Sequence, residues 1–268
     1  MGHNALKACN KCLKSFVTPS FGEKAYFGGF DHANWPPTTL EDQMEAMRNH
    51  KSAKILDEAR QIERQFGVKY SVLSSLRLPY YNFVQQSVID PMHNLFTGTA
   101  HKVLATWKGN KILTREHFED IQTLIDAFCV PRSVGRIPHK ISSGFSGFKS
   151  DQWRTWTVVY SLVALKPLLP SQHYTMWVKF VEAVYLICRR SVTLDDIEKA
   201  DELFLSFCED FEQLFGSQEC TINMHLHCHL KDCILDFGPP YAFWVYSFER
   251  CNGYLGQYPS NKKALSVN

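Results

Sequence analysis

Apolar side chains recur at helical spacing along most of the chain, and this pattern predicts a mostly α-helical protein. Between residues 40 and 66, apolar residues return every three or four positions among charged ones, and Gly67 follows as a helix end. At Asp90 an aspartate precedes Pro91, which is a typical helix start. The same periodicity predicts further helices that begin at Thr114 and Asp151 or span 173–190 and 195–215.

The segments between these helices show other signals. Residues 131–150 are rich in glycine, serine, proline and basic residues and are predicted to form a loop. Ala242-Phe-Trp-Val-Tyr246, which follows Gly238-Pro-Pro240, is the best candidate for a β-strand. The first 40 residues contain several glycines and prolines, so we expect an irregular arm that something other than helix packing holds in place.

Composition narrows the class of protein only partly. The 268 residues are 45% hydrophobic, enough for a core in one large or two small domains. A net charge of +2 neither favours nor excludes nucleic acid, because DNA-binding proteins depend on local basic patches. The longest uncharged apolar run, 155–165, is too short to cross a bilayer, so no membrane partner is expected. Nine scattered cysteines are typical of reduced thiols in the cytosol or nucleus.

Two pairs of metal-binding side chains lie near opposite ends of the chain. Cys9 and Cys12 form a CxxC, and His225 and His229 are four positions apart on one face of a predicted helix that Thr221 caps. Each pair alone is weak, since a CxxC is often not a metal site and the histidines could be a surface cluster. Together they predict a Cys2His2 zinc site. Four protein ligands leave no open position, so the zinc would be structural.

Three further residues are candidates for an active site. Glu249 follows the predicted strand, with Ser247 as a possible helix cap, and Asp90 is followed three positions later by His93. Purely structural interpretations remain open for both. Glu249 could be a first-turn carboxylate that the helix dipole favours, and Asp90 with His93 could be a helix cap with a first-turn histidine.

Taken together, these blocks resemble the transposases of CACTA (En/Spm)-like elements, and the resemblance covers essentially the whole chain. No single block is specific for this family, but their occurrence together in this order is. In chain order they are Gly2–Ala5 leading into Cys9–Cys12, Leu78–Tyr81, Val88–Gly98, Asn223–Leu230, Gly238–Pro240 and Phe248–Gly253.

The resemblance implies a ribonuclease H-like core similar in plan to the hAT and Transib transposases and the V(D)J recombinase. In that plan the catalytic acids are Asp, Asp and Glu, and a large helical insertion separates the second Asp from the Glu. It implies that Cys9, Cys12, His225 and His229 bind zinc and that Glu249 is the third acid, while Asp90 and His93 match a family DxxH. The expected divisions are a zinc-binding arm (1–39), a helical insertion domain (40–216) and a C-terminal strand–helix piece (217–268).

The chain departs from the family in its acids. The first two catalytic aspartates lie upstream of the CxxC in the family, whereas Asp31 is the first aspartate here and follows it. Catalytic Mg²⁺ is therefore expected only in a complete core, and this chain alone is predicted to be inactive. A nuclear location, DNA at transposon ends and a homodimer are what the resemblance implies.

Two alternatives remain open. One is a domesticated nuclear module that binds DNA or protein without catalysis, and the other is a zinc-stabilised helical scaffold unrelated to DNA. The basic residues of the 131–150 loop are candidates for phosphate contacts, although they are equally consistent with a solvated loop. They are Arg132, Arg136, Lys140 and Lys149.

Overall fold

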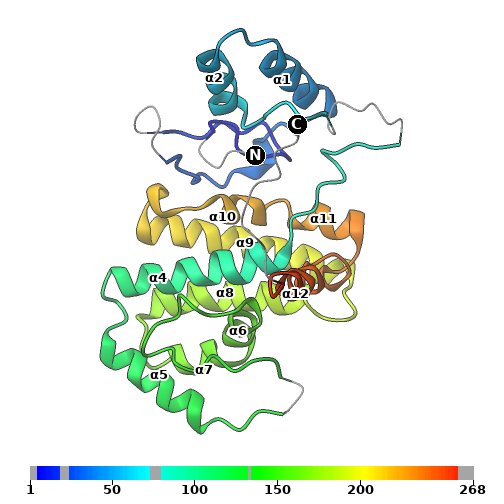
Figure 1. Ribbon diagram of the computed structural model, residues 1–268. Helices are drawn as coiled ribbons and strands as arrows, with labels where there is room; N and C mark the ends of the chain where they lie inside the picture. The colour runs from blue at the N-terminus through cyan, green and yellow to red at the C-terminus, as the bar shows by residue number, and fades with distance from the viewer. Residues whose placement is uncertain (1–4, 19–23, 73–79, 132–133, 259–268) are drawn as a thin grey trace.

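The structure is a computed structural model that describes residues 5–18, 24–72, 80–131 and 134–258 (Figure 1). These residues are mostly helical, which confirms the predicted fold class at that level. They contain no β-strand, only isolated bridges between Cys12 and Pro37 and between Val17 and Tyr26. The sheet of a ribonuclease H-like core therefore stays a prediction. None of the helices in the described segments has the length and apolar character needed to cross a bilayer.

The larger part of the molecule is a body of packed helices (Figure 1). In chain order its elements are η2 (Met92–Ala100, π-helical), α4 (His101–Gly109), α5 (Arg115–Ala127), α6 (Ser150–Thr155), η3 (Trp156–Tyr160, π-helical), α7 (Ser161–Leu165), α8 (Ser171–Ile187) and α9 (Leu194–Phe215). Helices α8 and α9 share the most extensive contact. The predicted starts at Thr114 and Asp151 and the predicted end at Gly216 agree with these bounds to within one residue.

Aromatic side chains fill the centre of this body. Trp107 and Trp177 are fully buried with ring centroids 5.6 Å apart, and Phe180 lies 5.0 Å from Trp177. The indole N–H of Trp177 donates to Ser161 Oγ at 2.9 Å, so its polar atom is satisfied inside the core. Truncating one such ring to alanine typically costs about 3–5 kcal/mol.

The predicted helix over 40–66 is two helices, α1 (Leu40–Ser52) and α2 (Leu56–Phe66). The break brings Met47 of α1 against Val68, which follows α2, and one straight helix could not make that contact. Gly67 ends α2 in the left-handed conformation at φ 68°, as its position predicted.

The N-terminal arm has little regular structure beyond η1 (His32–Asn34). Backbone hydrogen bonds hold it beside α2, since the N–H of Leu6 donates to the carbonyl of Arg64 at 2.7 Å and that of Lys7 to Gln65 at 3.0 Å. In Figure 1 the arm, α1 and α2 form a smaller unit next to α9 of the body and to α10 (Ile222–His227). Helices α1 and α2 thus lie with the arm, although they fall within the predicted 40–216 division.

The C-terminal part consists of η4 (Ser217–Glu219), α10 (Ile222–His227), α11 (Leu230–Phe237), η5 (Pro240–Ala242) and α12 (Tyr246–Leu255). The strand predicted over 242–246 is wrong. The N–H groups of Ala242 and Trp244 donate to the carbonyls of Pro239 and Pro240, so turn hydrogen bonds take the donors that a strand would use. Ser247 consequently lies inside α12 rather than at its cap.

Candidate metal centre and the Asp90 pocket

The backbone of the N-terminal arm turns tightly at the CxxC. The N–H of Lys11 donates to Cys9 Sγ at 3.3 Å, a local contact that fixes the thiol next to its own turn. On the other side, the N–H of Thr38 donates to the carbonyl of Lys11 at 2.9 Å and that of Leu13 donates to Pro36 at 2.8 Å. Both cysteine side chains are buried as a result.

The histidine pair meets this turn across the whole length of the chain. Cys12 Sγ lies 3.4 Å from His225 Nε2, although 213 positions separate the two residues. One ligand atom each from Cys9, Cys12, His225 and His229 lies within 4.8 Å of the others, and all four side chains are buried. The structure therefore brings together the four residues that the sequence singled out.

The backbone between His225 and His229 differs from the single helix that was predicted. Helix α10 ends at His227, and His229 precedes α11 instead of continuing the same helix. The last turn tightens because the N–H of Cys228 donates to the carbonyl of His225 and that of His229 to Leu226, both three residues back. The rings of His225 and His229 still lie 5.2 Å apart.

The chemistry of the cluster fits a metal ion. Nδ1 of His225 and Nε2 of His229 are buried and have no hydrogen-bond partner among the described residues. Hydrogen bonding from the Cys12 thiol lowers the pKa of Cys9, and burial lowers the pKa of His225, so a thiolate and a neutral imidazole are favoured. Two sulfurs and two nitrogens are the donor set of a structural zinc site. This cluster can hold a metal ion such as zinc.

Aromatic residues of the arm enclose the cluster. The ring of Trp35 stacks on His225 at 4.4 Å, and Phe16 meets the same imidazole edge-on at 4.9 Å. The ammonium of Lys14 lies 4.2 Å from the Trp35 ring on the outside. This apolar shell keeps water away from the four ligands, in keeping with a structural rather than a catalytic metal.

His227, the third histidine of the motif, belongs to the core instead. It is fully buried, with Nε2 3.1 Å from Thr99 Oγ1 and Nδ1 3.6 Å from Cys208 Sγ. Burial lowers its pKa to about 3, so the ring is neutral at physiological pH. On a helix, a spacing of two residues from His225 and from His229 points His227 away from both, which agrees with this separate place.

We expect His227→Ala to lower the free energy of unfolding by about 2–4 kcal/mol, because it leaves a cavity and removes the partner of Thr99. Its metal content should equal that of the wild type. Denaturant unfolding and metal analysis of the purified variant test this, with the exposed His139→Ala as the control. Loss of the metal in His227→Ala would contradict the ligand assignment.

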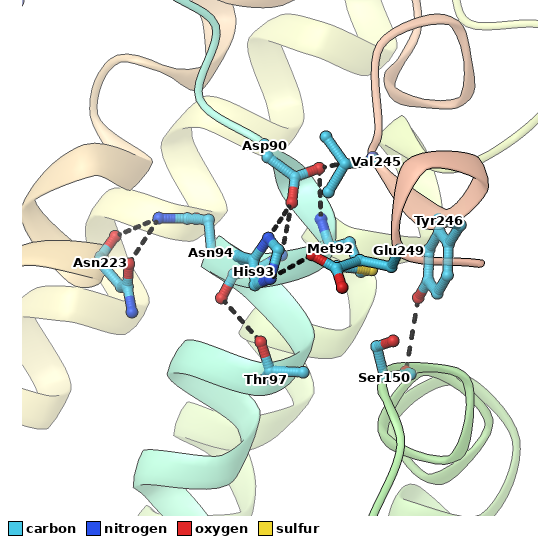
Figure 2. A network of polar contacts seen from close by, with 10 residues as sticks. All are labelled: Asp90, Met92, His93, Asn94, Thr97, Ser150, Asn223, Val245, Tyr246 and Glu249. Atoms are coloured by element: carbon cyan, nitrogen blue, oxygen red, sulfur yellow. Dashed lines mark hydrogen bonds and ion pairs between the residues drawn. The ribbon is translucent and has the colours of Figure 1, made fainter. Parts of the chain in front are cut away.

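A second group of predicted residues converges at the start of η2 (Figure 2). Asp90 Oδ2 accepts a hydrogen bond from His93 Nδ1 at 2.6 Å, and His93 Nε2 lies 3.7 Å from Glu249 Oε1 on α12. Asp90 also caps the helical turn that begins at Pro91 and continues as η2, as its sequence position predicted, by accepting from the N–H of His93 at 3.0 Å. The three candidate active-site residues thus lie together, although Glu249 is far away in sequence.

The opposite side of η2 packs on α10, so the two sites share one scaffold. The Nδ2 of Asn94 donates to the carbonyl of Asn223 at 2.9 Å. A Cβ on Gly98 would lie 2.2 Å from the Asn223 side chain and 2.6 Å from the carbonyl of His93, so this close approach requires glycine. Helix α10 carries His225, and η2 carries His93.

His93 and Glu249 border a pocket of about 1080 Å³ between α6, α12 and the 134–149 segment. Four cationic side chains line it, and none of them has an ion-pair partner in the described part of the chain. They are Arg136, Lys149, Arg154 and Arg250. Of the predicted phosphate contacts, Arg136 and Lys149 face this pocket, Lys140 is not part of its lining, and Arg132 lies outside the described residues.

Arg154 and Arg250 are the site residues that sequence reasoning missed. Arg154 lies on α6, where its guanidinium is 5.4 Å from the ring of Trp244 and its buried Nε has no hydrogen-bond partner among the residues described. Arg250 adjoins Glu249 on α12. Neither has a sequence signal of its own, because the pocket arises from segments about a hundred residues apart.

No protein family profile matches the chain, and searches of curated proteins and of solved structures likewise find no match. The two sites themselves are therefore the guide to function.

Proposed function

We propose that this chain is the zinc-containing helical region of a DDE-type DNA transposase, with Glu249 as the third catalytic acid. The convergence of Asp90, His93 and Glu249 beside four unpaired cations is the observation that supports this most directly. The three residues come from two separate blocks of the family resemblance, Val88–Gly98 and Phe248–Gly253, and nothing in a helical scaffold requires these blocks to meet.

In this proposal the Cys2His2 cluster binds zinc and joins the N-terminal arm to α10. The zinc would act on folding rather than on chemistry, since all four coordination positions belong to the protein. Rigid attachment of α10 also fixes η2, because Asn94 and Asn223 connect the two elements. The metal site would therefore hold the scaffold on which the pocket is built.

Glu249 is half exposed and offers one carboxylate to the pocket. Two magnesium ions in phosphoryl transfer polarise the phosphate and activate the attacking oxygen, and they need several carboxylates. The other carboxylate in the lining, Asp151, accepts a hydrogen bond from the backbone N–H of Arg136 at 2.9 Å. We therefore propose that Mg²⁺ would bind here only when further acids join Glu249, and that the chain alone binds DNA without cleaving it.

The cations of the pocket suit the phosphate backbone. An arginine or lysine without a carboxylate partner is free to contact a phosphate oxygen, and such contacts position DNA without reading its sequence. The alternative is a nuclear module that keeps this binding but has lost catalysis. It is favoured by the fact that Glu249 is the only carboxylate in the described lining of the pocket besides Asp151, which already accepts a backbone hydrogen bond. Both proposals place DNA, and in the first case the ends of an element, in the same pocket.

Salt-dependent DNA binding tests the proposal. If four cations contact phosphates, the logarithm of the association constant should fall with the logarithm of salt concentration with a slope of about −4. Fluorescence anisotropy with a labelled duplex of mixed sequence measures this slope for the zinc-loaded chain. No binding at low salt would contradict both the transposase region and the DNA-binding module.

A further inference from the structure

Both oxygens of the Asp90 carboxylate accept hydrogen bonds from other groups of the protein (Figure 2). Its Oδ1 accepts from the N–H of Met92 at 3.3 Å and from the N–H of Val245 at 3.0 Å. Its Oδ2 accepts from the N–H and from Nδ1 of His93, at 3.0 and 2.6 Å. Three of these donors belong to the first turn of η2, and the fourth lies 155 positions away, just before α12.

An ionised carboxylate offers about four lone-pair positions, and here four donors take them. The side chain is 14% exposed, whereas that of Glu249 is 47% exposed. A cation or substrate would have to displace at least one of these hydrogen bonds to reach Asp90. Of the two carboxylates near His93, only Glu249 is free for a ligand.

Helix α12 depends on few contacts for its position. None of its ten residues is buried, and Phe248 and Leu255 are 70% and 68% exposed. Of these ten residues only Tyr246, which is partly buried, packs against the hydrophobic core, so burial of apolar surface by the rest of the helix contributes little to holding it. Among the described residues, the other contacts that tie α12 and the residues just before it to the body are the Tyr246 hydroxyl to the Ser150 carbonyl at 3.4 Å, the His93–Glu249 pair and the Arg154 guanidinium over the Trp244 ring.

We propose that Asp90 is a positioning residue that fixes α12 against η2, so that Glu249 faces His93 and the pocket. Its bond to His93 Nδ1 also orients the ring with Nε2 toward Glu249. The inference depends on the proposed function only in taking Glu249 as the acid to be positioned. Asp90 of the DxxH therefore has no chemical role in this inference. It positions another acid, Glu249.

Hydrogen exchange of the zinc-loaded chain tests this inference. In Asp90→Ala the amides of Val245 and α12 should exchange at least about tenfold faster than in the wild type, because a hydrogen bond to a charged group is lost. Asp90→Asn keeps a carbonyl oxygen that can accept part of the set and should lie between the two. Amides of α8 and α9 should be unchanged. Asp126→Asn, which alters the exposed pair of Asp126 with His139, is the control and should leave α12 unchanged.

Two results would overturn the inference. One is α12 exchange that is the same in the wild type and both Asp90 variants. The other, which needs no variant, is an unprotected Val245 amide in the wild type, so the test survives even if the variants fail to fold. Failure of the proposed function would appear separately, as absence of DNA binding by a wild-type chain whose Val245 amide is protected.

Discussion

Replacing Cys9 and Cys12 by serine is expected to abolish the proposed binding of zinc and to lower the free energy of unfolding of the metal-loaded chain by at least about 5 kcal/mol. The binding free energy of a structural zinc is folding free energy, because the unfolded chain has no preformed site. Here the ligands come from the two ends of the chain, so the loss also frees the arm from α10. The effect should be largest in the arm and in α10, as measured by hydrogen exchange.

Metal analysis and thermal unfolding of matched variants check this prediction. His225→Ala with His229→Ala should lose the same zinc, since both pairs serve one ion. Cys129→Ser with Cys251→Ser is the control, because both of these thiols are exposed and lie outside the cluster. Zinc that persists after loss of either pair would show that the four residues do not form one site. The proposal that a metal holds α10, and through it η2, in place would then be wrong.

Features of this structure that depend on interactions between residues close in sequence were predictable, and features that depend on distant residues were not. The helix starts at Thr114 and Asp151 and the end at Gly216 depend on caps that a few neighbouring residues provide, so the sequence predicts them well. The break between α1 and α2 depends instead on Met47 meeting Val68, and periodicity alone could not reveal it. At Pro240 the turn overrides the apolar, β-favouring run that follows it.

The candidate sites show the same division. The four residues of the candidate metal site were predictable because CxxC and HxxxH spacings have a chemical meaning before the chain folds, even though the helix between His225 and His229 is interrupted. No sequence pattern could predict the contact between Asp90 and Val245, because Val245 donates through its backbone N–H, which almost every residue type has. Arg154 was expected only as part of a helix, and its place in the pocket depends on how α6 lies against α12.

The two sites are mechanically connected through η2 and α10. One face of η2 presents His93 to α12, Asp90 contacts Val245 just before η2 begins, and the other face of η2 packs on the helix that carries His225. A structural metal at one end of this arrangement can therefore influence the geometry of the pocket without contacting it. For this reason DNA binding should be measured with zinc-loaded protein, since loss of the metal would disturb the scaffold of the pocket.

Replacing the four unpaired cations of the pocket by glutamine should weaken binding of duplex DNA at low salt by at least about tenfold. The salt slope should fall by about 3 to 4, because each lost phosphate contact removes about 0.9. The matched control replaces four cations that already pair with carboxylates on the surface and so gives the same net charge. Its substitutions are Arg48→Gln, Lys69→Gln, Arg115→Gln and Lys199→Gln.

The comparison of the two quadruple variants separates a specific pocket from general charge. Exposed ion pairs contribute little to stability, so the control should fold, and the pocket variant has no ion pair to lose among the described residues, so the two can be compared at equal zinc content. If DNA contacts this face, only the pocket variant loses affinity and slope, whereas the control stays close to the wild type. Equal losses would mean that the net charge alone attracts DNA, and the placement of a phosphate backbone beside Glu249 would then be wrong even though the chain binds nucleic acid.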